Sequence, residues 1–290
     1  MNIYHIPVLA KEIVEFIPQN TEFFFDGTLW HWWHAEYILN NIPTIKKYIG
    51  VDRDYKMLEK AKKRLEKFKD KIVFINESYA NIDKISNQLN IKFDSILLDL
   101  WVNMEHFKDP SRWFSIKQDW PLDMRFDTNQ NFTAEKLIKT YSLLQLAELF
   151  QKYWDFSEKY SKFIASEIIS KRKKQDINTT FKLKNLLKNL WLNDKKISVI
   201  FQCLRIEVNQ ELKELEFFLE KFINFLNKWW RIFIITYHSV EDRLVKQKFK
   251  QLVDKWLGKL VNKHVIKPSW QEIKNNRAAR SAKLRILEKF

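Results

Sequence analysis

The sequence has very little glycine and almost no cysteine. Three glycines occur among 290 residues, whereas average usage near 7% would give roughly 20, and few folds of this size make their turns with so few. The single cysteine, Cys203, excludes a disulfide framework and a cysteine metal site, so a reduced, cytoplasmic compartment is expected. No apolar run approaches the length of a membrane span. Because Lys11, Glu12 and Glu15 interrupt the first apolar stretch, no signal peptide is expected.

The chain carries a large excess of positive charge. Its 51 Lys and Arg residues exceed its 36 Asp and Glu residues by 15, and its isoelectric point is near 9.6. This balance favours a polyanionic partner, most simply a nucleic acid. A bias of the genome toward A and T, which enriches Lys, Asn, Ile and Phe, is an alternative explanation for part of the excess.

A nucleotide-binding βαβ unit is predicted near the N-terminus. We expect a buried strand at Phe23–Asp26, a tight loop at Gly27–Trp33, a helix at His34–Asn41 and a second strand at Lys47–Val51, closed by Asp52. In units of this order the first loop runs close to the ligand, and the acid after the second strand binds ribose hydroxyls.

Further strands and helices alternate up to residue 100. Asp54 is positioned to cap a helix, Lys71–Ser78 is expected to be a third strand, and Phe93–Leu100 is a continuous apolar run typical of a central parallel strand. This alternation predicts an open α/β sheet with its ligand crevice at the carboxyl ends of the strands, where Tyr79 and Asp99 would lie.

From residue 102 the alternation gives way to helical periodicity. Helices are expected over 133–153, 156–172, 179–190 and 208–228, before the sheet resumes with a strand at Arg231–Ser239, a helix through Lys255 and a last strand at Ala282–Glu288. We therefore expect one domain made of 1–101 and 205–290, with an inserted, mainly helical domain at 102–204. The basic runs on these helices, at 171–174 and at 182–188, are equally consistent with RNA recognition and with ordinary solvated faces.

Several phrases, taken together and in order, resemble one family. They are HIPVLAKEIVEFI, DGTLWHWWHAEYIL, GVDRD, LLDLWVN, RWFSIKQDWPLDMRFD, FQCLRIEVNQELKELE, ITYHSVEDRLVK and NNRAARSAKLR. The chain resembles the ribosomal RNA small subunit methyltransferase H (MraW type) enzymes nearly end to end. The resemblance implies a class I, Rossmann-like methyltransferase sheet with an inserted helical domain that recognises RNA. It also implies the activity: transfer of a methyl group from S-adenosyl-L-methionine to N4 of a decoding-centre cytosine in 16S rRNA of the small ribosomal subunit.

The tryptophans depart from this family in one direction. The family's pattern has glycine at eight positions that are tryptophan here: 30, 32, 33, 101, 113, 120, 229 and 230. Glycine suits a ligand loop because the backbone must approach the ligand closely. We hypothesise that these codons are UGA, which some bacteria read as glycine and others as tryptophan. For Trp191, Trp256 and Trp270 the family's pattern does not decide between a true tryptophan and a misread glycine.

The resemblance carries cofactor contacts onto seven residues of this chain: Trp32, Trp33, His34, Asp52, Tyr79, Asp99 and His106. Loop amides and a helix N-terminus suit the methionine carboxylate, an acid suits the ribose hydroxyls, and an aromatic face suits the adenine. The family usually has an amide side chain at the position of His106. Read without the resemblance, Asp52 and Asp99 are also consistent with simple strand-end caps.

The proton acceptor is less well defined by the sequence. Methyl transfer to an amine needs in-line positioning and a group that takes a proton, and the candidates are Asn103, His238 and Asp242. His238 is equally consistent with a structural role. No metal is expected, since the acidic residues 119, 123 and 127 are interpreted as ion-pair partners of Arg112 and Arg125. Two alternatives stay open: a non-catalytic RNA-binding relative with a blocked cofactor loop, and a methyltransferase for a small molecule or protein.

Overall fold

The chain divides into two compact units. A computed structural model describes residues 7–29, 32–100, 118–127, 130–154 and 156–290. One unit, here the sheet unit, comprises 1–101 and 213–290, and the other, the helical unit, comprises 102–212. The second boundary lies eight residues beyond the expected one at 204, because helix α10 (Asp194–Val208) continues past that point.

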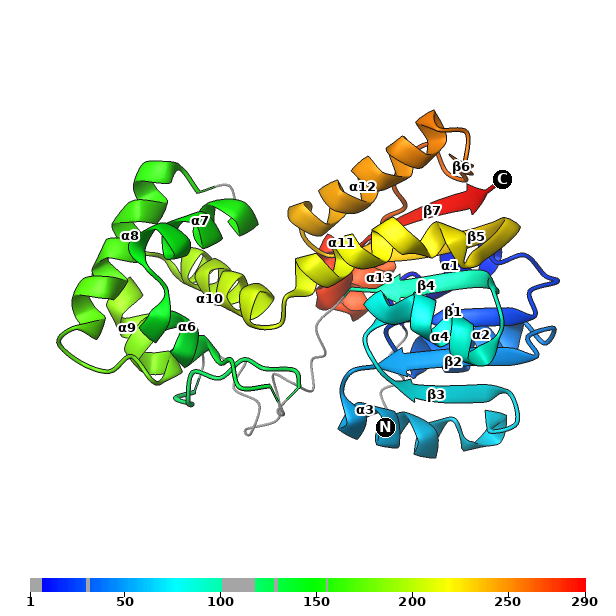
Figure 1. Cartoon of the computed structure of the whole chain (residues 1–290), viewed down its shortest axis with the longest axis horizontal. Coiled ribbons are helices and arrows are strands. Elements are labelled where there is room, and N and C mark those ends of the chain that lie inside the picture. The colour runs from blue at the N-terminus through cyan, green and yellow to red at the C-terminus, as the bar shows by residue number, and fades with distance from the viewer. Residues whose placement is uncertain (1–6, 30–31, 101–117, 128–129, 155) are drawn as a thin grey trace. The chain divides into compact units, whose positions relative to one another are not determined.

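The sheet unit is built on seven strands in the order β3-β2-β1-β4-β5-β7-β6 (Figure 1). β1 to β5 pair in parallel, whereas β7 is antiparallel to both of its neighbours. The strand bounds are β1 Phe23–Asp26, β2 Lys47–Asp52, β3 Ile72–Asn76, β4 Phe93–Asp99, β5 Leu226–Thr236, β6 Gly258–Leu260 and β7 Lys283–Lys289. The predicted open α/β sheet is confirmed, and the reversal of strand order beside β1 is where such sheets hold ligands.

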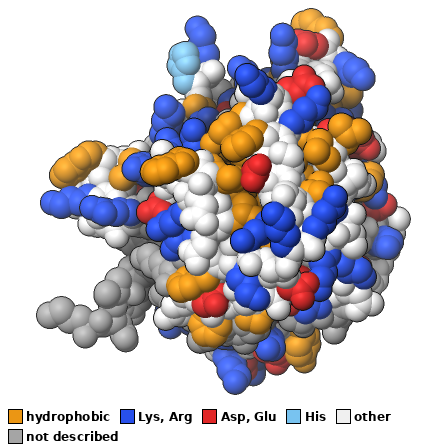
Figure 2. All heavy atoms as spheres, turned by 90° about the vertical axis from the view of Figure 1, so that its left-hand side faces the viewer, with side chains coloured by type: hydrophobic (Ala, Val, Ile, Leu, Met, Phe, Trp, Pro, Cys, Tyr) orange, Lys and Arg blue, Asp and Glu red, His pale blue; other side chains and the backbone are white. Residues whose placement is uncertain are grey.

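Five helices are described in the helical unit: α6 Ala134–Thr140, α7 Leu143–Trp154, α8 Glu158–Arg172, α9 Thr180–Asn189 and α10. The expected single helix over 133–153 is two helices, because the backbone becomes extended at Tyr141, with ψ 137°. Arg172 donates from Nη1 to the carbonyls of Ile138 and Tyr141 at this break. Figure 2 looks onto this unit and shows Lys and Arg side chains spread over it among hydrophobic ones.

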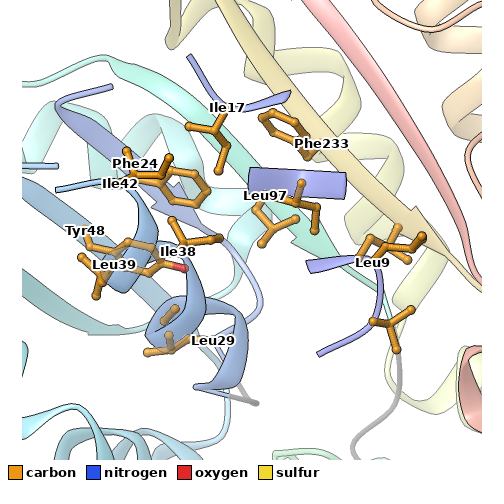
Figure 3. Close-up of a cluster of buried hydrophobic side chains, with 14 of the residues drawn as sticks. Leu9, Ile17, Phe24, Leu29, Ile38, Leu39, Ile42, Tyr48, Leu97 and Phe233 are labelled. Atoms are coloured by element: carbon orange, nitrogen blue, oxygen red, sulfur yellow. The ribbon is translucent and has the colours of Figure 1, made fainter. Parts of the chain in front are cut away.

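Helices cover both faces of the sheet. They are α1 Ala10–Phe16, α2 Trp33–Asn41, α3 Tyr55–Arg64, α4 Ile82–Leu89, α11 Glu211–Lys221, α12 Ser239–Asp254 and α13 Trp270–Asn275. Successive strand residues face opposite sides. Phe24 therefore joins a core with residues of α1, α2 and α3, whereas Phe25 joins a second core with residues of α4, α11 and α12. Figure 3 shows part of the first core, with Phe24 beside residues of α2 such as Ile38. Among the described residues, no helix is both long and apolar enough to cross a membrane.

Candidate cofactor site at the carboxyl edge of the sheet

A buried carboxylate ties the end of β1 to its neighbours. Tyr48 Oη on β2 donates to Asp26 Oδ2 over 2.7 Å, and the Thr28 amide donates to Asp26 Oδ1 over 3.0 Å. Thr28 Oγ1 in turn accepts the amide of Asp99 over 2.7 Å. Burial raises the pKa of Asp26 to about 6, although the hydrogen bond from Tyr48 opposes this. Asp26 is thereby tied to Tyr48, near the start of β2, and through Thr28 to the end of β4. We call the ends of β1, β2 and β4 the carboxyl edge.

Asp52 closes β2 at this edge. Its Oδ1 accepts the amide of Asp54 over 2.7 Å, and Asp54 caps α3 by accepting the amide of Lys56. Asn76 of the adjacent strand donates to the carbonyls of Asp52 and Arg53, which fixes the turn. Asp52 is half-buried, so a ligand at this edge could reach its carboxylate. Burial, more than the nearby Asp54 carboxylate, raises the pKa of Asp52 to about 7.

His34 and Asp99 lie together and are almost fully buried. His34 is in the first turn of α2, and its Nδ1 lies 3.6 Å from Asp99 Oδ2. Its Nε2 lies 2.9 Å from the carbonyl of Val8, a contact in which the ring nitrogen is the donor. The imidazole therefore joins the segment before α1 to the end of β4. Asp99 is positioned by its backbone through Thr28 and by its side chain beside His34.

The other predicted cofactor contacts that the structure describes are Tyr79, Trp32 and Trp33. Tyr79 is half-buried, with its ring edge-on to Phe218 at 5.6 Å. The rings of Trp32 and Trp33 meet edge to face at 5.9 Å. Trp32 precedes α2 with φ −40°, so the left-handed strain that a glycine position would impose is absent there. At Trp32, therefore, only the bulk of the indole, and not backbone strain, opposes tryptophan in the cofactor loop.

Two of the candidate proton acceptors are engaged elsewhere. His238 caps α12, accepting the Glu241 amide at Nδ1, and its Nε2 lies 2.7 Å from Glu241 Oε1. Burial opposes ionisation of Asp242, but hydrogen bonds from Arg285 (2.8 Å) and Lys283 (3.0 Å) outweigh it and lower the pKa of Asp242. Either residue would have to leave these partners to accept a substrate proton.

Some predicted site residues lie outside the described residues: Trp30, Trp101, Asn103, His106, Arg112 and Trp113. Of the acidic residues considered for a metal, Asp123 pairs with Arg125 at 2.7 Å, and Asp119 accepts the amide of Phe181. Among the residues described, no group of three His, Cys, Asp or Glu side chains is arranged to hold a metal ion.

Sequence reasoning missed the pairing of Asp26, Thr28 and Tyr48. The DGT phrase places Asp26 and Thr28 in the ligand loop, and an acid directly before a loop is a signal that could have singled them out. No sequence signal pointed to Tyr48, because its hydroxyl reaches Asp26 from the neighbouring strand, 22 residues further along the chain. Tyr237, directly after β5, was also missed, and burial together with the Asp99 carboxylate raises the pKa of this phenol.

This fold and this edge define a Rossmann-like methyltransferase of the S-adenosylmethionine-dependent class. A family model described as the MraW methylase family matches residues 2–290, and the chain belongs to that family. It is 38% identical to the ribosomal RNA small subunit methyltransferase H of Elusimicrobium minutum, over 100% of this chain and 99% of the relative. It is 34% identical to the enzyme of the same name from Halothermothrix orenii, over 98% of each.

Among solved structures, an rRNA methylase from Streptococcus thermophilus covers 97% of this chain and 93% of its own, at 10% identity and a TM-score of 0.43. At that level of likeness the neighbour adds no weight to the family assignment.

Proposed function

We propose that the protein methylates N4 of a decoding-centre cytosine in 16S rRNA, using S-adenosyl-L-methionine, in the cytoplasm. The observation that carries the proposal is the match of nearly the whole chain to relatives named for methylation of small-subunit ribosomal RNA. The buried carboxyls at the carboxyl edge support it, because they lie where a class I sheet holds its cofactor.

The described residues of the edge fit the cofactor. The Asp52 carboxylate would accept from the ribose hydroxyls, and the face of Tyr79 is suited to the adenine. The backbone at Gly27 is tightly enclosed, since an added Cβ would lie 2.4 Å from Leu98 Cδ2 and 2.8 Å from Tyr79 Cβ. His34, at the start of α2, lies where helix amides could hold the methionine carboxylate, and Asp99 would supply negative charge toward the sulfonium.

The chemistry asks the chain mainly for positioning. When bound, S-adenosylmethionine supplies an already activated methyl group. The protein must align the cytosine amine with that methyl group and take up the proton that the amine loses. His238 is engaged with Glu241, and Asp242 is engaged with Arg285 and Lys283. Asn103 stays a predicted site residue alongside them, as a hydrogen-bond acceptor for the amine, since an amide side chain does not take up a proton. The target base must also leave its stack to reach the edge.

The helical unit is proposed to bind the RNA. Lys173 and Lys174 at the end of α8 are exposed, as is Lys182 on α9, so these cations can reach phosphates. Arg172 is different, because its guanidinium is occupied by the carbonyls that end α6. The predicted basic run at 171–174 therefore divides into a structural arginine, a half-buried Lys171 and the exposed Lys173 and Lys174.

The tryptophans at family glycine positions are proposed to be glycine in the organism's own code. The positions are 30, 32, 33, 101, 113, 120, 229 and 230. In the cofactor loop this exchange would remove two indoles, Trp32 and Trp33, from the start of α2. With indoles at these positions, the non-catalytic RNA-binding reading would apply instead.

The test uses the chain with glycine at 30, 32, 33 and 101. We expect transfer of a labelled methyl group from S-adenosylmethionine to small-subunit particles, and less or none to protein or small-molecule acceptors. Transfer confined to a non-RNA acceptor would contradict the proposed substrate. RNA binding without any transfer would favour the non-catalytic reading.

A further inference from the structure

Left-handed backbone in this protein is occupied by residues that rarely adopt it. Within the described residues, seven non-glycine residues have positive φ, and no glycine does. Three of the seven are tryptophans: Trp191 (φ 60°), Trp229 (φ 68°) and Trp256 (φ 56°). Tryptophan makes up only 12 of 290 residues, about 4% of the chain, so three of seven is about a tenfold enrichment. A bulky side chain in this region is a genuine outlier.

Two of these tryptophans end helices in the same way. After α9, Trp191 donates to the carbonyl of Lys188, three residues back, and Leu192 donates to that of Leu187, five residues back. After α12, Trp256 and Leu257 repeat this pattern with Val253 and Leu252. This pairing is the Schellman motif, whose left-handed residue is usually glycine and sometimes asparagine.

A third helix shows the motif with an accepted residue. At the end of α4, Asn90 (φ 53°) donates to Asn87, and Ile91 donates to Ser86. Asparagine tolerates left-handed φ because its short polar side chain bonds locally. Trp191 and Trp256 therefore occupy the backbone position that asparagine fills at α4, without that compensation.

Trp229 lies at an irregularity within the sheet. Between the pairs Phe93–Leu226 and Ser95–Arg231, β4 advances two residues while β5 advances five. The extra residues of β5 form a bulge, and a left-handed residue in a bulge is commonly glycine. The same backbone criterion thus singles out a residue within a strand as well as two after helices.

Burial does not explain these indoles. Trp191 is 96% exposed, Trp256 83% and Trp229 64%. An exposed indole gains little from removal of apolar surface from water, so little offsets the left-handed strain. Gly50 and Gly258 are required for lack of space and not for positive φ, since a Cβ at either position would lie 2.5 Å from a neighbouring atom.

We infer that residues 191, 229 and 256 are glycine in the protein that the organism makes, with UGA as the codon at each. For 191 and 256 the inference comes from backbone geometry alone, where the family pattern does not decide. It does not depend on the proposed function, since it concerns helix ends and a bulge rather than methyl transfer.

Paired substitutions separate the indole from its Cβ. Trp191→Gly and Trp256→Gly are compared with Trp191→Ala and Trp256→Ala by denaturant unfolding of the full chain. Alanine removes the indole but keeps the left-handed penalty, so each glycine variant is expected to have the smaller unfolding equilibrium constant, by several-fold to about tenfold. Trp270→Gly is the matched control, because Trp270 is 72% exposed but begins α13 without positive φ. That variant is expected to be no more stable than the parent chain.

The direct test is the protein from its own source. Mass spectrometry of the tryptic peptide Asn189–Lys195, and of a peptide spanning 255–259, is expected to give the masses with glycine at 191 and 256. Tryptophan at either position would overturn the inference there. Equal stability of the alanine and glycine variants would overturn the geometric argument, whatever the methyltransferase assay shows.

Discussion

The two units bury different kinds of polar side chain. In the sheet unit the described buried set includes seven acids: Asp26, Asp54, Asp94, Asp99, Glu241, Asp242 and Glu288. In the helical unit the described buried polar residues are Ser161, Thr180 and Asn209, none of them charged. Burying a carboxylate costs free energy unless it is hydrogen-bonded, so acids kept inside one unit indicate precise placement there. Of the charged residues that the structure describes in the helical unit, none is buried, which suits a polyanion better than a small ligand.

The largest effect is expected from the tryptophans of the cofactor loop. We predict that the all-tryptophan chain binds S-adenosylmethionine poorly or not at all, because indoles stand where the backbone should approach the ligand. Glycine at 30, 32, 33 and 101 should restore binding, measured by calorimetry. Strong binding by the all-tryptophan chain would contradict the codon hypothesis at these positions.

Removing the acid at the end of β2 should have the second-largest effect on cofactor binding. Asp52→Ala in the glycine-restored chain deletes two charged hydrogen bonds to the ribose, each contributing about 1.5–3 kcal/mol. The dissociation constant for S-adenosylmethionine should rise tenfold or more. An unchanged constant, with the fold intact by circular dichroism, would remove Asp52 from the site.

Cofactor affinity should also depend on pH through the same residue. Burial raises the pKa of Asp52 to about 7, so the carboxylate that accepts the hydroxyls is lost as pH falls through 7. Between pH 8 and pH 6 the dissociation constant should rise by up to about tenfold. Asp52→Asn should flatten this profile, and an equally steep profile in that variant would assign the titration to another group.

Charge changes in the helical unit should weaken RNA binding and leave cofactor affinity unchanged. Lys173→Glu with Lys174→Glu should weaken RNA binding several-fold and flatten its dependence on salt. The matched control is Lys246→Glu with Lys250→Glu, the same charge change on exposed lysines of α12 in the sheet unit. If both pairs change the salt slope equally, the effect comes from net charge and not from the helical unit.

The smallest effect on affinity is expected at Tyr48. Tyr48→Phe leaves Asp26 Oδ2 buried without its donor, which should lower the free energy of unfolding by about 1–3 kcal/mol. Cofactor affinity should fall only a few-fold, since the loop is shifted rather than removed. An unchanged free energy of unfolding would show that the hydrogen bond contributes nothing net.

Local sequence patterns made much of the sheet unit predictable. The strand at Phe23–Asp26 has the predicted bounds, and Asp54 caps α3 as expected. α10 was not predicted, because its buried residues include neighbours such as Val199, Ile200 and Phe201, which blur a one-sided apolar pattern. β5 begins five residues earlier than predicted, since its bulge interrupts the apolar run.

The placement of the candidate site residues was predictable only where it follows from the order of strands and loops along the chain. Asp52 and Asp99 are the last residues of β2 and β4, and parallel strands bring their ends to one edge. The contact of His34 with Val8, and that of Tyr48 with Asp26, join residues 26 and 22 positions apart. Such pairings depend on strand order and packing, which no local pattern encodes.

The most direct test is to locate the methyl group on the RNA. Small-subunit particles are treated with the glycine-restored protein and labelled S-adenosylmethionine, and the 16S rRNA is digested to nucleosides for mass spectrometry. We predict label in N4-methylated cytidine from one decoding-centre position. Label in another nucleoside, or at N4 of cytosines elsewhere in the RNA, would contradict the account.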